Sequence, residues 1–379
     1  MRLGIDASNL RRGGGVTHLI QMLGAADPPA AGFDTVVVWG ADSTLAQLAD
    51  RPWLVKHAVA EFGDNLVRRA LWQRSRLGPL ARGEQCDLLF VPGGSFATSF
   101  KPVVVMSRNM LPFEWRELLR FGFSPQTVKM LFLRWSQSRS LQRADGVIFL
   151  TCYAQRAILR VTGPIGGALA IIPHGVEPRF RKAPRLPRPL EECSDSHPLR
   201  LIYVSIIDVY KHQWRVVEAV AQLRARGYPV LLDLIGPAYA PALKLLCRTM
   251  QRVDPQGHAI RYLGPVSYSE LHTSYAGADI AVFASSCENM PNILLEAMTS
   301  GLPIACSNRG PMPEILGGAG RYFDPEHADS ISAVIVELIQ SPELRTRLAR
   351  EAFERAQDFS WARCARETFA FLARIASSG

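Results

Sequence analysis

The sequence has few of the features that mark membrane-spanning, disulfide-bonded or secreted proteins. No apolar run reaches the ~18 residues that a transmembrane helix requires. The first residues, Arg2-Leu3-Gly4-Ile5-Asp6, have the pattern of a short strand followed by glycines rather than that of a signal peptide. The seven cysteines are scattered and include no C-x-x-C pair, which argues against a disulfide framework and indicates a reducing compartment. We therefore expect a cytoplasmic protein that is soluble or, at most, peripheral at the inner face of the cell membrane.

Motifs for several other chemistries are also missing. The chain holds no P-loop, no Gly-x-Ser-x-Gly and no histidine pair or carboxylate cluster with metal-ligand spacing. No motif for nucleic-acid binding accompanies its basic residues. We expect a protein with no metal, no cofactor and no nucleic-acid partner.

The positive charge is unevenly distributed along the chain. Residues 1–180 contain 21 Lys and Arg against 13 Asp and Glu, whereas the remaining residues contain 22 against 21. Almost the whole net charge of +9 therefore belongs to the first half. Such a surplus attracts nucleic acid, anionic lipid or an anionic substrate, and the missing motifs leave the last two.

Length and periodicity predict two α/β domains. A chain of 379 residues exceeds what one core usually supports. Strand-like and helical runs alternate from the start, as in parallel doubly wound sheets. The predicted strands are 3–6, 35–39, 88–91, 103–106, 146–150, 199–207, 230–235, 260–263 and 279–284, and the predicted helices include 212–226, 240–253 and 267–276. We predict two Rossmann-like domains facing across a cleft, at 1–180 and 199–358, with a Pro-, Arg- and Glu-rich linker at 181–198 and a last helix at 359–379.

The second domain contains the most informative stretch of the sequence, residues 284–301, ASSCENMPNILLEAMTSG. A strand-like run passes through a polar turn into a helix predicted at Pro291–Thr299, which an asparagine ahead of the proline can cap. Helix amides at the carboxyl end of a strand hold phosphates in open α/β sheets. Glu288 in the turn and Glu296 in the helix can border the same crevice. Amides that bind a diphosphate and carboxylates that bind hydroxyls together suggest a sugar nucleotide as ligand. The alternative is that Glu288 is a solvated loop residue and Glu296 a charge on the helix surface.

A second loop of the same domain brings a cation to this edge. The segment Tyr203–His212 sits after the first strand of the second half and faces the same crevice by the doubly wound rule. Lys211 in this loop can neutralise the charge that develops on a departing diphosphate, as a metal ion would otherwise do. A solvated surface lysine is the alternative.

The spacing of the two glutamates resembles the signature of family-4 glycosyltransferases, retaining enzymes with the GT-B fold. The resemblance rests on Glu288-x7-Glu296, on Ala297-Met298 and on Gly301-x-Pro303, and it extends over nearly the whole chain. It implies that Glu288 contacts the donor sugar and Glu296 the ribose hydroxyls. It also implies that the last helix crosses back to the first domain; packing on its own domain is the alternative.

The chain departs from the family pattern at two places and shares one further loop with it. The family usually has an arginine where this chain has Ile206, so Arg309 or backbone amides are expected to compensate. A family histidine that contacts the donor sugar is replaced here by Arg108 and Asn109, and Asn109 is either a sugar ligand or a turn residue. The glycines after the first strand resemble the family's N-terminal glycine loop, although a flexible turn explains them equally well. The predicted catalytic residues are Glu288, Lys211 and Asn109, and the predicted donor-binding residues are Glu296, Asn289, Met290, Pro291, Asn292, Gly14, Gly15, Ser205 and Arg309.

We therefore predict a retaining, metal-independent hexosyltransferase that uses a nucleoside-diphosphate sugar and a glycan or lipid-linked acceptor. A UDP-sugar 2-epimerase of the same fold and a catalytically inactive nucleotide-sugar-binding protein remain the alternatives. The basic and aromatic segments 113–143 and 65–82 further suggest docking on an anionic membrane surface. Ordinary core helices with solvated arginines are the competing explanation of those segments.

Overall fold

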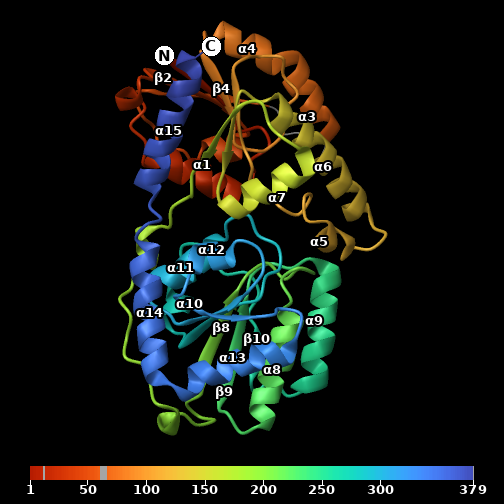
Figure 1. Cartoon of the computed structure of the whole chain (residues 1–379), viewed down its shortest axis with the longest axis vertical. Helices are drawn as coiled ribbons and strands as arrows, with labels where there is room; N and C mark the ends of the chain where they lie inside the picture. The colour runs from red at the N-terminus through yellow and green to blue at the C-terminus, as the bar shows by residue number, and fades with distance from the viewer. Residues whose placement is uncertain (12, 60–65, 379) are drawn as a thin grey trace. The chain divides into compact units, whose positions relative to one another are not determined.

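The chain folds into two units, each built on its own parallel sheet. The structure is a computed structural model that describes residues 1–11, 13–59 and 66–378 (Figure 1). Unit 1 contains Met1–Gly175 and Ser360–Gly379, and unit 2 contains Val176–Phe359. The prediction of two doubly wound parallel-sheet domains is confirmed.

Unit 1 has a sheet of seven parallel strands in the order β3-β2-β1-β4-β5-β6-β7. The strand order reverses between β1 and β4. Its strands are β1 Arg2–Asp6, β2 Thr35–Gly40, β3 Leu54–Ala58, β4 Leu88–Val91, β5 Val103–Met106, β6 Gly146–Phe149 and β7 Ala168–Ile171. Its helices are α1 Gly14–Gly24, α2 Asp42–Leu45, α3 Leu66–Trp72, α4 Gly78–Gly83, α5 Trp115–Leu119, α6 Pro125–Arg143, α7 Cys152–Thr162 and α15 Trp361–Ser377, with a π-turn at Gln73–Leu77 and a 3-10 turn at Pro29–Ala31.

Unit 2 has six parallel strands in the order β10-β9-β8-β11-β12-β13. Figure 1 shows α8 and α9 on one side of this sheet and α11 and α14 on the other. Its strands are β8 Leu199–Val204, β9 Val230–Ile235, β10 Ile260–Tyr262, β11 Ile280–Phe283, β12 Ile304–Ser307 and β13 Arg321–Phe323. Its helices are α8 Gln213–Ala225, α9 Ala240–Val253, α10 Leu271–Ala276, α11 Asn292–Thr299, α12 Met312–Leu316, α13 Ala328–Gln340 and α14 Pro342–Ala356, with 3-10 turns at Pro178–Phe180 and Leu190–Glu192.

The central strands are buried on both faces. All four residues of β5 and of β11 are buried, as are those of β4, β6 and β12. Strands covered by helices on both faces read as continuous apolar runs, and that is why β4, β5, β6 and β11 were predicted from the sequence, whereas β12 was not. The carboxyl ends of the parallel strands meet at one edge of each sheet, where the loops that follow them lie together.

Residues 181–198, predicted as a linker, belong to unit 2 and pack along its other elements. The amide of Lys182 donates to the carbonyl of Thr299 at 3.0 Å. The guanidinium of Arg188 pairs at 3.0 Å with the carboxylate of Asp279, whose side chain is 10% exposed. This segment is therefore fixed along the surface of the unit by backbone and charge contacts.

The last helix, α15, packs within unit 1. Figure 1 draws it in blue beside the red N-terminal elements, and it contacts α1 and β4. The ring of Phe369 lies 6.1 Å from that of Phe33, edge to face. The ring of Phe371 packs directly against Gly146, where a Cβ would lie only 3.0 Å from a ring atom. The C-terminal residues thus complete the core around the N-terminal strands.

Candidate functional site

Two loops of unit 2 meet where the strand order of its sheet reverses. Strand β8 has β9 on one side and β11 on the other. The loops after β8 and β11 therefore begin at the ends of neighbouring strands and continue to opposite sides of the sheet order. Crevices at such points hold ligands in doubly wound sheets. The loops are joined: the Ser286 amide donates to the carbonyl of Tyr210 at 2.8 Å, and the Ser286 hydroxyl lies 2.8 Å from Nε2 of His212. This edge is therefore preorganised.

Lys211 and Glu288, predicted as catalytic residues, form an ion pair across these loops. The ammonium of Lys211 donates to Oε1 of Glu288, although the two residues are 77 positions apart. Their side chains are 5% and 15% exposed. The Lys211 ammonium also lies 5.1 Å from the ring centroid of Tyr210 and 5.5 Å from that of Phe283. Apolar walls strengthen the attraction within the pair and make either charge costly without the other.

Backbone geometry fixes the position of Lys211. Its amide donates to the carbonyl of Asp208 at 3.0 Å, and its carbonyl accepts from the hydroxyl of Tyr203 at 2.7 Å. His212, which follows, has a φ of 52° and stands ahead of α8. Non-glycine residues in this left-handed region persist only where surrounding contacts impose it. The lysine is thus held by its backbone as well as by Glu288.

A third loop, after β12, borders the turn that carries Glu288. A Cβ built on Gly310 would lie 3.9 Å from the amide nitrogen of Glu288. Arg309, predicted to compensate for Ile206, pairs with Asp324 at 2.7 Å and has a 38% exposed side chain. Its charge is therefore partly balanced by a carboxylate of the loop after β13, while Ile206 is exposed.

The start of α11 differs from the predicted one. Pro291 occupies the position before the helix with extended backbone, and Asn292 is the first helical residue. The residue at the capping position is thus a proline, which makes no side-chain cap, rather than the predicted asparagine. The first backbone bond runs from the Leu294 amide to the carbonyl of Pro291 at 3.1 Å. The amides ahead of it precede the first intrahelical bond, as at every helix start.

The remaining predicted residues of this edge are buried. Asn289 and Met290 are 6% and 7% exposed, and Ser205 is 2% exposed. The amide of Ser205 donates to the carbonyl of Ile235 at 2.8 Å. Its hydroxyl oxygen has no hydrogen-bond partner within the described part of the chain. A buried hydroxyl in that state is a candidate to bind a ligand atom.

Glu296 lies in a separate, aromatic environment. It is 2% exposed, and burial raises the pKa of its carboxyl to about 7. The hydroxyls of Tyr268 and Tyr275 hydrogen-bond to it, the latter at 3.4 Å from Oε2. The guanidinium of Arg179 stacks 4.6 Å from the Tyr268 ring centroid and pairs with Glu177. Glu296 therefore lies in the helix that follows the turn of Glu288 but contacts a different set of side chains.

The predicted residues of unit 1 lie around the start of α1. Gly14 and Gly15 are its first two residues, and the guanidinium of Arg108 donates to the carbonyl of Gly14. Burial lowers the pKa of Arg108 to about 10. The side chain of Asn109 accepts from the Leu111 amide at 3.1 Å. In this structure Asn109 therefore has the role of a turn residue, and Arg108 is the side chain that reaches the glycine loop.

Sequence inspection missed the groups that surround the charged residues. Tyr210 and Phe283 enclose Lys211, and Tyr268 and Tyr275 enclose Glu296. Only Tyr210, next to Lys211 in the chain, gave a local signal. In residues 1–11, 13–59 and 66–378, no group of three or more His, Cys, Asp and Glu side chains has the arrangement of a metal site.

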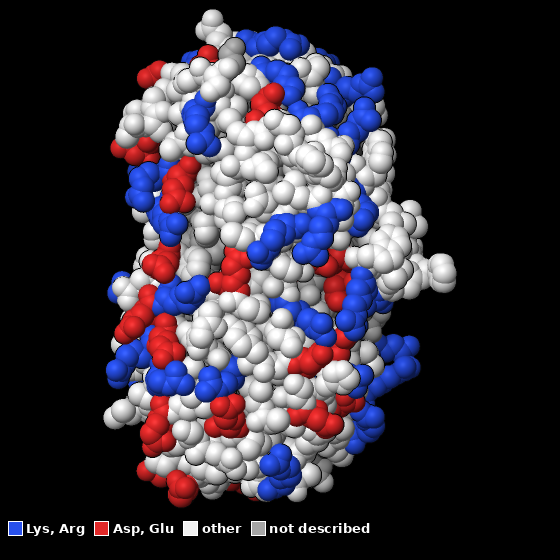
Figure 2. Space-filling view, in the orientation of Figure 1, with Lys and Arg blue, Asp and Glu red and all other residues white. Residues whose placement is uncertain are grey.

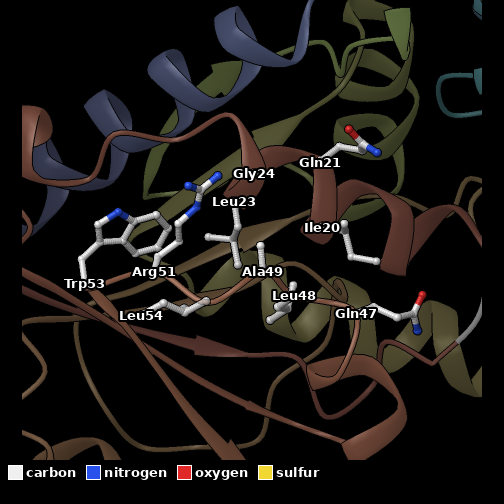
Figure 3. A pocket seen from close by; sticks show the side chains of 10 residues that line it. All are labelled: Ile20, Gln21, Leu23, Gly24, Gln47, Leu48, Ala49, Arg51, Trp53 and Leu54. Carbon is white, nitrogen blue, oxygen red and sulfur yellow. The ribbon is translucent and has the colours of Figure 1, made fainter. Parts of the chain in front are cut away.

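A cavity of about 150 Å³ opens in unit 1 beside α1 (Figure 3). None of the predicted site residues lines it, so we do not assign it to the site. Its lining residues are Ile20, Gln21, Leu23, Gly24, Gln47, Leu48, Ala49, Arg51, Trp53 and Leu54.

Comparison with known proteins finds a family model that matches part of the chain. Residues 192–355 match the model of the glycosyl transferases group 1. The chain is 38% identical over 109 residues to the O-antigen chain mannosyltransferase B of Escherichia coli, which is 29% of either chain. Matches to the first curated relatives span 29% to 53% of those proteins' length.

Solved structures resemble the whole chain. The crystal structure of Anabaena Alr3699/HepE in complex with UDP has a TM-score of 0.73 and 18% identity, covering 98% of this chain and 99% of that one. WaaG, a glycosyltransferase involved in lipopolysaccharide biosynthesis, has a TM-score of 0.71 and 15% identity over 98% and 99%. At such identities the likeness establishes the fold, which is GT-B.

Proposed function

We propose that the protein is a retaining glycosyltransferase of family 4 that transfers a hexose from a nucleoside-diphosphate sugar. The acceptor is a hydroxyl of a lipid-linked or polysaccharide precursor of the cell surface, and the reaction takes place in the cytoplasm. The family match over unit 2, the GT-B neighbour with UDP and the similarity to an O-antigen mannosyltransferase support this assignment.

The observation that carries the proposal is the Lys211–Glu288 pair at the switch point of unit 2. In the proposed reaction the donor diphosphate replaces Glu288 as the partner of Lys211. The released carboxylate then accepts hydrogen bonds from hydroxyls of the donor sugar. As the bond between the anomeric carbon and the phosphate oxygen breaks, negative charge grows on the phosphate, and the ammonium of Lys211 stabilises it without a metal ion.

The other residues of unit 2 have supporting roles in the proposal. Amides at the start of α11 and the hydroxyl of Ser205 contact the diphosphate, and Arg309 adds a second cation once it leaves Asp324. The carboxylate of Glu296 binds the ribose hydroxyls of the nucleotide. The acceptor oxygen bonds to the anomeric carbon on the face that the phosphate leaves, and its proton passes to the departing phosphate oxygen.

A thermal-shift screen with UDP, GDP and ADP tests the donor class. A ligand at a hundredfold excess over its Kd stabilises the native state by about 2.7 kcal/mol. We expect one nucleotide to raise Tm in the wild type and a smaller rise in Lys211→Ala. Lys244→Ala, an exposed lysine of α9, is the matched control and should behave as the wild type.

Turnover of the donor found in that screen tests the chemistry. We expect activity that survives EDTA and that falls on the order of 10²-fold in kcat for Lys211→Ala, by analogy with the loss of one preorganised donor. Binding without hydrolysis or transfer in the wild type would favour an inactive nucleotide-sugar-binding protein instead.

A further inference from the structure

Helix α6 exposes an apolar stripe of the kind that core-facing helices bury. Val128, Leu131, Phe132 and Trp135 are 68%, 41%, 42% and 60% exposed. Their spacing of three, four and seven residues places them on one face. The opposite face packs against unit 1 through Met130, Gln137, Ser140 and Leu141, which are buried. The exposed stripe is therefore additional to the face that holds the helix in place.

The short helix α5 and the turn after it extend this apolar face. Trp115 and Leu119 are 53% and 54% exposed, and Phe123 is fully exposed at 112%. Figure 1 shows the α5–α6 connection projecting from unit 1, and Figure 2 shows uncharged atoms at that projection. Scattered apolar residues are ordinary on a surface, but several bulky ones on adjoining elements mark an interaction site. We call Trp115, Leu119, Phe123, Val128, Leu131, Phe132 and Trp135 the apolar ridge.

Cationic side chains lie beside the ridge, and the two carboxylates of the same segment bind other residues. The guanidinium of Arg134 lies 5.7 Å from the ring centroid of Trp115, and that of Arg139 lies 6.0 Å from Trp135. Arg116 and Lys129 are exposed nearby. Of the two carboxylates in residues 113–143, Glu117 is buried and pairs with Arg120. Glu114 accepts a hydrogen bond from Tyr153. The ridge is thus apolar and aromatic with a positive border.

We propose that the apolar ridge docks unit 1 on the surface of a bilayer that contains anionic lipids. Tryptophan and phenylalanine insert at the level of the headgroups, while arginine and lysine contact the lipid phosphates. The docking is peripheral, since no helix in the described ranges is long and apolar enough to span a bilayer.

Charge complementarity favours a bilayer over a second copy of the chain. A symmetric dimer through this ridge would bring the same cations of two copies face to face, and like charges at an interface are repulsive. An anionic bilayer provides the opposite charge over a large area. One cation near such a surface contributes about 1 kcal/mol, so removing it lowers vesicle binding about fivefold.

Co-sedimentation of the full chain with vesicles tests the proposal without any donor or acceptor. Vesicles of phosphatidylcholine with phosphatidylglycerol are compared with vesicles of phosphatidylcholine alone at low and high salt. We expect binding to the anionic vesicles only, weakening as salt rises. Equal binding to both vesicles, or no binding at low salt, would overturn the proposal and leave the donor chemistry of unit 2 untouched.

Matched variants locate the contact. Phe123→Ser with Trp135→Ser should lower binding at least tenfold, whereas Leu186→Ser, an 86% exposed residue of unit 2, should not. Lys129→Glu with Arg139→Glu should abolish binding, and Lys244→Glu with Arg248→Glu on α9 should lower it far less. Because the changed side chains are exposed, the Tm measured by circular dichroism should be the same in the variants as in the wild type. If the ridge variants bind vesicles as the wild type does, or only dissociate a dimer in size-exclusion chromatography, the ridge does not bind lipid.

Discussion

Lys211 and Glu288 show how one contact sets the behaviour of two residues. Each is nearly buried, and each balances the charge of the other. A buried ion pair contributes little beyond an apolar replacement, but a single buried charge without its partner is strongly destabilising. The two residues therefore act as a unit in stabilising the fold.

Alanine substitutions at this pair should be strongly non-additive. We expect Lys211→Ala and Glu288→Ala each to cost about 3–5 kcal/mol of unfolding free energy, and the double variant to cost less than their sum. Urea denaturation of the wild type, the two single variants and the double variant measures the coupling free energy between the two residues. Additive losses would mean that the pair does not form in solution.

Glu296 has its ionisation shifted by its surroundings. Its pKa of about 7 in the folded protein lies above the usual 4.5 because burial disfavours the carboxylate. As pH rises through this window, the unfolded chain loses a proton that the folded chain keeps. Ionisation therefore favours unfolding, and the penalty is complete only above the folded-state pKa.

The variant Glu296→Gln should remove this pH dependence. At pH 8 we expect it to raise the unfolding free energy relative to the wild type by on the order of 3 kcal/mol more than it does at pH 4.5. Thermal melts at both pH values measure the difference. An identical shift in Tm at the two pH values would show that Glu296 ionises normally. Nucleotide affinity of the same variant tests the proposed ribose contact separately.

At the scale of elements, the segment 181–198 depends on a glycine at the end of α11. Gly301 has a φ of 66°, and a Cβ there would lie 2.6 Å from the carbonyl oxygen of Lys182 and 2.7 Å from the nitrogen of Pro184. Both the backbone angle and the close approach therefore require glycine. This is the glycine of the Gly-x-Pro pattern, and here its role is to let the segment pack.

Gly301→Ala should cost more than the same change at a glycine with open space. We expect about 1–3 kcal/mol for the left-handed angle, with a further loss from displacement of the segment. Gly227→Ala is the control, because its φ is 83° and no described atom lies within 4 Å of the built Cβ. Chemical denaturation compares the two. Equal losses would mean that the segment moves aside without cost.

At the scale of the whole molecule, the two units carry different surfaces and different proposed partners. The basic surplus belongs to the first half of the sequence, whereas the second half is nearly balanced. Unit 1 carries the apolar ridge with its cations, and unit 2 carries the Lys211–Glu288 pair. Anionic lipid and nucleotide should therefore act on separate segments.

Hydrogen exchange should separate the two partners. We expect the nucleotide found by the thermal screen to slow exchange in 205–212 and 284–292, and anionic vesicles to slow it in 113–135. Ligand binding protects the amides that it orders or covers. Lys211→Ala should lose the first effect and keep the second. Protection of 113–135 by nucleotide alone would require a different assignment of that face.

Local sequence determined the elements whose signals are strong within a few residues. The strands β4, β5 and β9 and the helix α9 have the predicted bounds, because continuous apolar runs and helical periodicity are properties of neighbouring residues. The edge strands β3 and β7 escaped detection, since their residues are mostly half-buried and lack such runs. β13, also at an edge, has only three residues, and the central strand β12, with four buried residues, was not predicted either.

Contacts between distant residues were decided by the tertiary structure alone. The sequence placed Lys211 and Glu288 on loops after neighbouring strands, because strand order in doubly wound sheets follows general rules. It did not determine that their side chains pair, that tyrosines enclose Glu296, or that the stripe of α6 faces solvent. A helical apolar stripe has the same spacing whether it is covered or exposed, and only the packing of the neighbouring elements decides which.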